Sequence, residues 1–317
     1  MAELAIIIGN GFDLDIGLSS KYTDFIKEKE WKELEESLKC FPKGYESHSL
    51  IAHLQRAAYS KEHWFDIEME ILNFIQDHPE CSEKEVREIY SEFERMRNAL
   101  KRYLSRISNG YKMDTEKYPY KFISKLVNCP KKIVVFNFNY TNPIEFLPPQ
   151  DSSPLFIRNQ ISVHGNLFEE DIVIGCNIPR GQRVNKDLSF MYKCNMLNKA
   201  NHVARNLLEA KDIIFYGHSV NEMDFGYFRE FFEAASASHK PIRHLTFITL
   251  NEKSERSIKD NISNQGISVT DLYNNLETFT FLHTEKLYKQ DAKEVQKWDD
   301  MFRRILTKER RGVRIIN

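Results

Sequence analysis

Residues 4–8, Leu-Ala-Ile-Ile-Ile, form an uninterrupted apolar run near the N-terminus and constrain the fold more than any other feature. A strand that is apolar at every position is buried on both faces, as in a parallel sheet that is covered by helices. With 317 residues the chain can bury one large core or two smaller ones. The first strand therefore predicts a sheet that lies inside the molecule.

The turn after this strand is rich in glycine and ends in an acidic residue. Gly9, Asn10 and Gly11 tolerate a tight, partly left-handed turn and the close approach of another backbone or of a ligand. Phe12 and Asp13 then begin the next element, which Asp13 can cap. A helix that starts here points free amide groups outward, and these suit a phosphate. An ordinary strand-to-helix turn is the alternative interpretation of a lone G-x-G.

Helical and strand-like segments then follow in a clear order. Helical spacing of apolar residues predicts helices over 20–39, 46–60, 62–77, 83–108 and 119–127. Strand-like runs return at 132–138, 156–165, 171–175, 212–217, 244–250 and 278–282, and helices fit at 197–210, 223–237, 253–264 and 291–307.

This order predicts an α/β fold with a Rossmann-like, mainly parallel sheet. A large helical insertion separates the first strand from the second. We expect an α/β nucleotide-binding core over residues 1–18 and 129–317, with the insertion over 19–128.

Composition excludes several classes of protein. The 45 basic and 46 acidic residues give a net charge of -1, which does not favour a broad nucleic-acid footprint. The five cysteines are scattered without a C-x-x-C pair, so we expect no zinc site. The N-terminus lacks the basic region of a signal peptide, and no apolar stretch is long enough to cross a bilayer. We therefore expect a soluble, cytoplasmic protein without a membrane partner.

Four predicted strands end in polar or glycine-containing turns. Ligands of open α/β sheets bind outside the carboxyl ends of the strands, so these turns predict one site. The candidate residues at the four ends are Gly9, Asn10, Gly11, Phe12, Asp13, Asn137, Asn139, His164, Gly217, His218, Ser219 and Asp224.

Several of the candidates also have a purely structural interpretation. Asn137 and Asn139 can pair their amides within a turn, and His164 can be a satisfied core histidine. Ser219 and Asp224 can cap a helix. In "HWFDIEMEIL" (63–72), Asp66 and Glu70 share a helix face, for which solvent exposure is the default and a lid the alternative.

Familiar nucleotide motifs do not fit. The dinucleotide fingerprint needs a third glycine where this chain has Leu14, and helices follow where its second strand should come. No Gly-Lys-Ser/Thr follows the glycines as in a P-loop, and "YGHSV" lacks the closing glycine of a nucleophile elbow. A hydride-transfer domain, a P-loop enzyme and a serine hydrolase are therefore disfavoured.

The motifs, taken in order, resemble the abortive infection AbiH-like family of bacterial phage defence. The resemblance runs to about residue 230 and rests on "IIIGNGFDLDIGLSSKYTDF", "HWFDIEME", "FNFNYTNPIE", "VHGNL" and "YGHSVNEMDF". A weaker likeness connects the chain to sirtuin-like NAD-binding domains, although Asp13 stands where they have serine and Thr141 where they have aspartate. The zinc cysteines of that fold are also missing, which argues against deacetylation.

The resemblance implies roles for the candidate residues. It makes His164 and Asn139 catalytic, with Asn139 beside the ribose next to nicotinamide. It makes the other ten candidates cofactor-binding residues; they lie in the first, second and last of the four turns. The first glycine turn would hold the phosphates. The expected ligand is NAD, as substrate or cofactor, without zinc.

The leading hypothesis is an anti-phage effector that binds and hydrolyses NAD or a related nucleotide at the N-glycosidic bond. One alternative is a nucleotide-sensing module that acts through a partner without turnover. Another is a nuclease or nucleic-acid-binding effector, which the neutral charge disfavours. The expected partners are a small-molecule nucleotide, a phage-derived trigger or protein, and further copies of the chain in a homo-oligomer.

Overall fold

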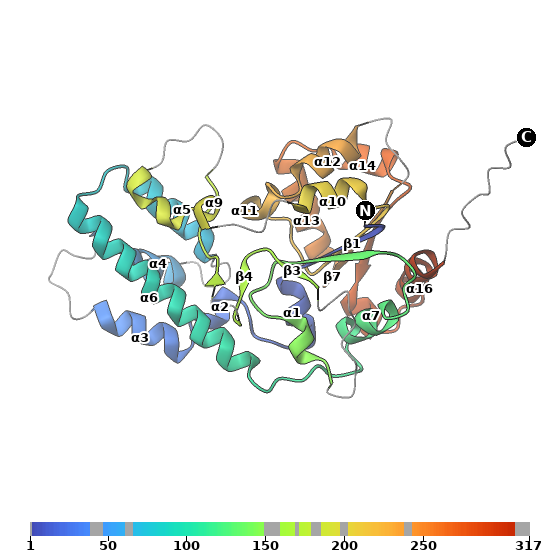
Figure 1. Cartoon of the computed structure of the whole chain (residues 1–317), viewed down its shortest axis with the longest axis horizontal. Helices are drawn as coiled ribbons and strands as arrows, with labels where there is room; N and C mark the ends of the chain where they lie inside the picture. Colours follow the sequence, from blue (N-terminus) through green and yellow to red (C-terminus); the bar gives the residue numbers. More distant parts are fainter. Residues whose placement is uncertain are drawn as a thin grey trace, which may run out of the picture.

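The computed structural model describes residues 2–38, 47–60, 66–148, 159–168, 171–178, 185–196, 202–237 and 243–307 (Figure 1). The basic segment 308–314 and residues 149–154 lie outside these residues.

A six-stranded sheet forms the centre of the fold, and every pairing within it is parallel. Its strands are β1 (Leu4–Ile8), β2 (Ile133–Asn137), β3 (Ile161–Ser162), β6 (Asp212–Tyr216), β7 (His244–Thr249) and β8 (Thr278–His283). Their order across the sheet is β3-β2-β1-β6-β7-β8. The expected α/β, Rossmann-like sheet is confirmed.

The strand order reverses between β1 and β6. From β1 the chain builds outward through β2 to β3, and then returns to the other side of β1 for β6, β7 and β8. Such a switch point leaves a crevice outside the carboxyl ends of the two central strands, where open α/β sheets bind ligands.

The first strand is buried on both faces, as its apolar run predicts. Ala5 and Ile7 belong to a cluster with α10, α12, α13 and α14, whereas Leu4, Ile6 and Ile8 pack with α1, α7 and α16 on the opposite face. These helices are α1 (Asn10–Ile16), α7 (Tyr118–Leu126), α10 (Val203–Glu209), α12 (Arg229–Ser236), α13 (Glu252–Asn264), α14 (Val269–Asn275) and α16 (Ala292–Leu306).

The expected helical insertion lies between β1 and β2. Its further helices are α2 (Tyr22–Phe25), α3 (Lys29–Leu38), α4 (Leu50–Ser60), α5 (Ile67–Asp77) and α6 (Glu83–Ser108). The helix predicted over 20–39 is thus two helices, and the turn between them lets Phe25 and Trp31 meet edge to face, with ring centroids 5.5 Å apart. Helix α6 has the predicted bounds because Ser82 and Glu85 form a capping box at its start.

The insertion shares its apolar core with a later segment of the chain. Ile172, Cys176, Met191 and Tyr192 pack into the same cluster as α3 to α6. This later segment contains the 3-10 helix η3 (Lys186–Met191) and α9 (Lys193–Met196), and Figure 1 shows α9 beside α5. The division into two units, 1–18 with 129–317 and 19–128, stays a prediction.

The strands expected at 156–165 and 171–175 are shorter than predicted. Gly165 has φ +71° and turns the chain out of the main sheet, so β3 has only two residues there. The two-residue strands β4 (Gly165–Asn166) and β5 (Asp171–Ile172) pair with each other, antiparallel, in a separate ribbon. Residues 156–158 lie outside the described part of the chain.

The remaining short elements lie near the strand ends. The helix expected over 223–237 is interrupted at Gly226 and consists of α11 (Glu222–Phe225) and α12. The 3-10 helix η2 (Pro143–Phe146) follows β2, and α15 (Thr284–Tyr288) follows β8. Neither α14 nor α15 was predicted, since their windows carry few apolar residues at helical spacing.

Candidate functional site

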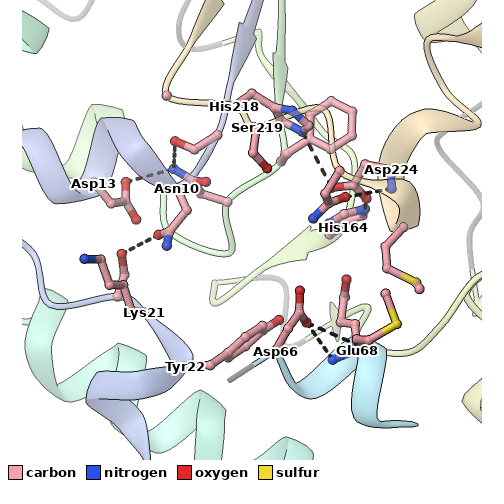
Figure 2. A pocket seen from close by; sticks show the side chains of 18 of the residues that line it. Asn10, Asp13, Lys21, Tyr22, Asp66, Glu68, His164, His218, Ser219 and Asp224 are labelled. Carbon is pink, nitrogen blue, oxygen red and sulfur yellow. Dashed lines mark hydrogen bonds and ion pairs between the residues drawn. The ribbon is translucent and has the colours of Figure 1, made fainter. Parts of the chain in front are cut away.

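A cavity of about 1150 Å³ opens at the switch point, at the carboxyl ends of β1, β2, β3 and β6. The helical insertion forms its opposite wall through α2 and the first turn of α5. Figure 2 shows Asn10, Asp13 and Lys21 on one side of this cavity and His164 and Asp224 on the other.

Nine of the twelve residues predicted from the sequence line this cavity. They are Gly9, Asn10, Asp13, Asn139, His164, Gly217, His218, Ser219 and Asp224. Gly11, Phe12 and Asn137 do not line it. The four strand ends therefore meet, as the parallel sheet predicted, while the role of each residue toward a ligand stays a prediction.

The glycine turn packs against protein backbone. A Cβ added at Gly11 would lie 2.6 Å from the Cα of Gly217, and one added at Gly9 would lie 2.6 Å from the Cα of His218. Gly217 itself has φ +67°, and its added Cβ would lie 2.2 Å from the amide nitrogen of Phe12. The glycines thus let the turns after β1 and β6 touch. Of the two expected partners of the glycine turn, another backbone or a ligand, the structure shows the backbone.

Two expectations about this turn are wrong. It is not left-handed, because Gly9 is extended at φ -125° and Gly11 lies inside α1, which has only seven residues. The amides of Gly11 and Phe12 are not free for a phosphate either: they donate to the carbonyl oxygens of Gly217, at 2.8 Å, and Gly9, at 2.9 Å. The ring of Phe12 is buried against Tyr216 at a centroid distance of 5.1 Å.

Asp13 carries a buried carboxylate at the edge of the cavity. Its two oxygens accept hydrogen bonds from Asn139 Nδ2, at 2.9 Å, and Thr141 Oγ1, at 2.5 Å. Burial raises the pKa of Asp13 to about 7, although both hydrogen bonds act in the opposite direction. A carboxyl group with this pKa exchanges protons at neutral pH, as a general base must.

The two asparagines after β2 hold this arrangement together. Asn139 Nδ2 also donates to the carbonyl oxygen of Gly9, at 3.1 Å, so its amide joins the turns after β1 and β2. The side chain of Asn137 donates through Nδ2 to the carbonyl oxygen of Thr141, at 2.7 Å, and accepts through Oδ1 from the backbone amide of Asn139, at 3.0 Å. For Asn137 the geometry is that of a structural turn amide.

A buried ionic cluster lies on the other side of the cavity. The ammonium of Lys193, on α9, lies 2.8 Å from Glu68 Oε2 and 3.1 Å from Asp224 Oδ1. Lys193 is fully buried, and both carboxylates line the cavity. We call Lys193, Glu68, Asp224 and His164 the buried proton cluster.

Opposing effects set the pKa values within this cluster. Burial raises the pKa of Glu68 to about 8 in spite of Lys193. Burial alone would also raise the pKa of Asp224, but Lys193, together with His164 and His218, outweighs it and holds the pKa of Asp224 well below its usual range. Burial would lower the pKa of Lys193, and the two carboxylates outweigh it and keep the pKa high. Asp224 and Lys193 are therefore ionised at neutral pH.

Both histidines of the site face Asp224. His164 Nε2 lies 3.2 Å from Asp224 Oδ1 without forming an aligned hydrogen bond. Burial, assisted by Lys193, lowers the pKa of His164, so its ring is neutral at pH 7. His218 Nδ1 accepts from the Val220 amide at 2.9 Å, so the ring proton is on Nε2, which lies 3.6 Å from Asp224 Oδ2.

The turn after β6 is held in an unusual backbone conformation. Val220 is β-branched and fully buried, yet it has φ 51°. Such residues are rare at positive φ and cost free energy, which is typical of functional sites. Asn221 closes the turn by accepting from the Asp224 amide at 3.0 Å, so Asp224 lies in the first turn of α11 and does not cap it.

The insertion contributes cavity residues that the sequence did not predict. Glu68 and Glu70 are buried and line the cavity, so the solvent-exposed face expected for "HWFDIEME" is wrong in the described part, 66–70. Asp66 caps α5 by accepting from the Glu68 amide at 2.9 Å. A second acidic residue among apolar neighbours was the available signal for Glu68, whereas no local pattern marked Lys193.

Comparisons with known proteins identify one family. The family model described as bacteriophage abortive infection AbiH matches residues 5–244. This range includes every element that lines the cavity except α13. No curated protein and no solved structure matches, so the likeness to sirtuin-like domains rests on the sequence motifs alone.

The described residues contain neither a membrane-spanning helix nor a metal-binding cluster. No helix among them is long and apolar enough to cross a membrane. No group of three or more His, Cys, Asp or Glu side chains among them is arranged to hold a metal ion.

Proposed function

This chain belongs to the bacteriophage abortive infection AbiH family, and we propose that it is a defence effector that hydrolyses an N-glycosidic bond of NAD or a related nucleotide. Family membership indicates the role in abortive infection. The reaction is inferred from the cavity at the switch point, and above all from Asp13, a buried carboxyl group with a pKa of about 7 at its edge.

The charge of the cavity suits this reaction. N-glycosidic cleavage passes through an oxocarbenium-like state, which carries positive charge on the sugar. Asp13, Asp66, Glu70, Glu222 and Asp224 line the cavity, so carboxyl groups from both walls face the developing cation. Preorganised negative charge stabilises such a state.

Asp13 is placed to act as the base. Asn139 and Thr141, which also line the cavity, fix the orientation of its carboxylate, so it needs no reorientation before it accepts a proton. In the proposed reaction Asp13 takes the proton of the attacking water, whose oxygen bonds to C1′ of the ribose. The bond between C1′ and the base nitrogen breaks, and its electron pair leaves with the base.

The remaining lining residues fit the rest of a nucleotide. Lys21 supplies an ammonium on the same side as Asn10 and Asp13, where a phosphate can bind (Figure 2). Aromatic rings of Tyr22, Phe138 and Tyr140 also line the cavity and offer faces on which a base can stack.

The test is release of free base. The purified protein is incubated with NAD and, separately, with ATP, and chromatography follows nicotinamide and adenine. We expect at least one base to be released, and Asp13→Asn to slow the release by about 10²–10⁴-fold. Release by Asp13→Asn at the wild-type rate would contradict the role given to Asp13.

Asp15→Asn is the matched control. Asp15 lies on the same helix but does not line the cavity, and its carboxylate accepts hydrogen bonds from Tyr216, at 2.6 Å, and Tyr288, at 2.8 Å. Its rate per folded molecule should equal the wild-type rate. An NAD-dependent rise in melting temperature without any product would favour the nucleotide sensor instead. Salt-sensitive binding of DNA or RNA would favour the nucleic-acid effector.

A further inference from the structure

The buried proton cluster holds more negative than positive groups. One ammonium, Lys193, lies between two carboxyl groups, Glu68 and Asp224, and the neighbouring ring of His164 is neutral. The side chains of Lys193, Glu68 and His164 are more than nine-tenths buried, and that of Asp224 is 11 % exposed. An uncompensated charge in such a place is costly, so the cluster binds one proton.

The contacts indicate which group carries this proton. Asp224 faces three nitrogen-bearing side chains, Lys193 at 3.1 Å, His164 at 3.2 Å and His218 at 3.6 Å. Within the part of the chain that the structure describes, Glu68 forms an ion-pair contact only with Lys193. The negative charge is better stabilised on Asp224, which leaves the proton on Glu68. The raised pKa of Glu68 and the lowered pKa of Asp224 agree with this division.

Among the described residues, no other titratable group around Glu68 carries a positive charge that would move the proton away from Glu68. Tyr22, Tyr140 and Tyr227 have phenol pKa values raised by burial, and burial also raises the pKa of the Cys176 thiol, so all four are neutral at pH 7. Asp66, one residue before α5, is a further carboxyl group nearby, and its negative charge favours the proton on Glu68.

We propose that Glu68 is the general acid of the reaction inferred above, and that the substrate is therefore a nucleotide whose base is uncharged, such as an adenine nucleotide. This rests on the proposed function. Nicotinamide in NAD is already cationic and leaves as a neutral molecule without a proton. A purine leaves as an anion unless an acid protonates one of its ring nitrogens, and a buried, protonated carboxyl group on the cavity wall supplies that proton.

Both carboxyl groups return to their initial protonation states after one turnover. The Glu68 carboxyl proton moves to a ring nitrogen of the base as the bond between C1′ and the base breaks. Water adds to C1′ and loses its proton to Asp13. Asp13 then releases that proton to solvent and Glu68 takes one up, so the net reaction consumes one water and yields free base and a ribose hydroxyl. Lys193 is a positioning residue, since it holds the second oxygen of Glu68.

The first measurement concerns the proton alone. Infrared spectroscopy of protein labelled with ¹³C-glutamate, at pH 7, should show a carboxylic acid band that is absent from Glu68→Gln and that disappears as the pH rises through about 8. If this band is absent from the wild-type protein, the inference is wrong whatever the activity.

The second measurement compares two leaving groups. We expect Glu68→Gln to slow adenine release from ATP by about 10²–10⁴-fold and to change nicotinamide release from NAD by less than about 3-fold. Wild-type adenine release should also decrease above pH 8, because the acid must be protonated, and this decrease should be lost in the variant. Equal slowing of both reactions, or a wild-type protein that releases nicotinamide but no adenine, would overturn the inference and leave the proposed function intact.

Glu92→Gln is the matched control for loss of a buried carboxylate. Glu92 lies in the same helical insertion, is equally buried, and accepts hydrogen bonds from Ser49 and the Ile51 amide, but it does not line the cavity. It should lower stability without changing the ratio of adenine to nicotinamide release. If the wild-type protein releases neither base, the proposed function fails and the general-acid role fails with it, while the infrared result still locates the proton.

Discussion

The two turns beside the cavity contain one residue that is suited to catalysis and two that are needed only for packing. Asp13 is chemically suited to proton transfer but costs stability, because its carboxylate is buried with only two hydrogen bonds. Gly11 and Gly217 do no chemistry, yet the turns after β1 and β6 can meet only if neither has a side chain.

The burial of Asp13 predicts a pH dependence of stability. Its pKa is raised from 3.8 to about 7 on folding, so the folded state binds the proton more tightly than the unfolded state. The stabilisation from this proton is complete below pH 4 and is lost as the pH rises to about 7. As the pH rises from about 4 to about 7, the free energy of unfolding of Asp13→Asn should therefore increase relative to that of the wild type, by up to about 4 kcal/mol. Above about pH 7 the difference between the two proteins should stay constant. Urea unfolding of both proteins at several pH values measures this, and a constant difference would contradict it.

The close approach of the turns predicts a folding defect at Gly11. In Gly11→Ala the new Cβ would lie 2.6 Å from backbone, which cannot move without separating the turns. We expect a loss of about 1–3 kcal/mol or more in the free energy of unfolding, before any effect on ligand binding. Gly226→Ala is the control, since its Cβ would meet nothing within 4 Å and its φ is -55°. Equal stability of Gly11→Ala and wild type in denaturant would refute the packing account.

At the scale of elements, the cluster joins three segments that are distant in the chain. Glu68 lies in α5, Lys193 in α9 and Asp224 in α11, so the contact between Glu68 and Lys193 joins the insertion to the later part of the chain. Only one of the two contacts of Lys193 is an ion pair between charged partners if Glu68 holds the proton. The two contacts should therefore differ in strength.

A double-mutant cycle measures that difference. We expect the coupling free energy between Lys193→Met and Asp224→Asn to be about 3–5 kcal/mol, as for a buried ion pair. The coupling between Lys193→Met and Glu68→Gln should be about 1 kcal/mol, as for a hydrogen bond to a neutral acceptor. Thermal or urea unfolding of the single and double variants provides both values. Couplings of equal size would mean that Glu68 is ionised in the folded protein.

Elements were predictable from the sequence where the signal is local. The bounds of α6 follow from apolar spacing and a capping box, and β1 follows from five apolar residues in a row. The gathering of strand ends was also predictable, because parallel strands end at the same edge of a sheet. The contact between Lys193 and Glu68 was not, since 125 residues separate them and nothing near Lys193 indicates burial of its ammonium.

At the scale of the whole molecule, the position of the insertion matters more for ligand binding than its size does. It follows β1 and the short helix α1, and it returns α2 and α5 to the carboxyl edge of the sheet, opposite the strand-end turns. A ligand in the cavity would contact both parts of the molecule. Binding should then stabilise both parts together, in contrast to a site that belongs to the α/β core alone.

Hydrogen exchange tests this arrangement with ADP-ribose, which keeps the sugars and phosphates of NAD, bound to the Asp13→Asn variant so that its adenine is released only slowly. We expect ADP-ribose to slow amide exchange in the turns 138–141 and 217–224 and, equally, in 20–25 and 66–70 of the insertion, because residues of all four segments line the cavity. Helix α16 lies behind the sheet with no lining residue and serves as the internal control, with unchanged exchange. Protection confined to the two strand-end turns would show that the insertion does not contact the ligand, and Glu68 would then be too far away to act as its acid.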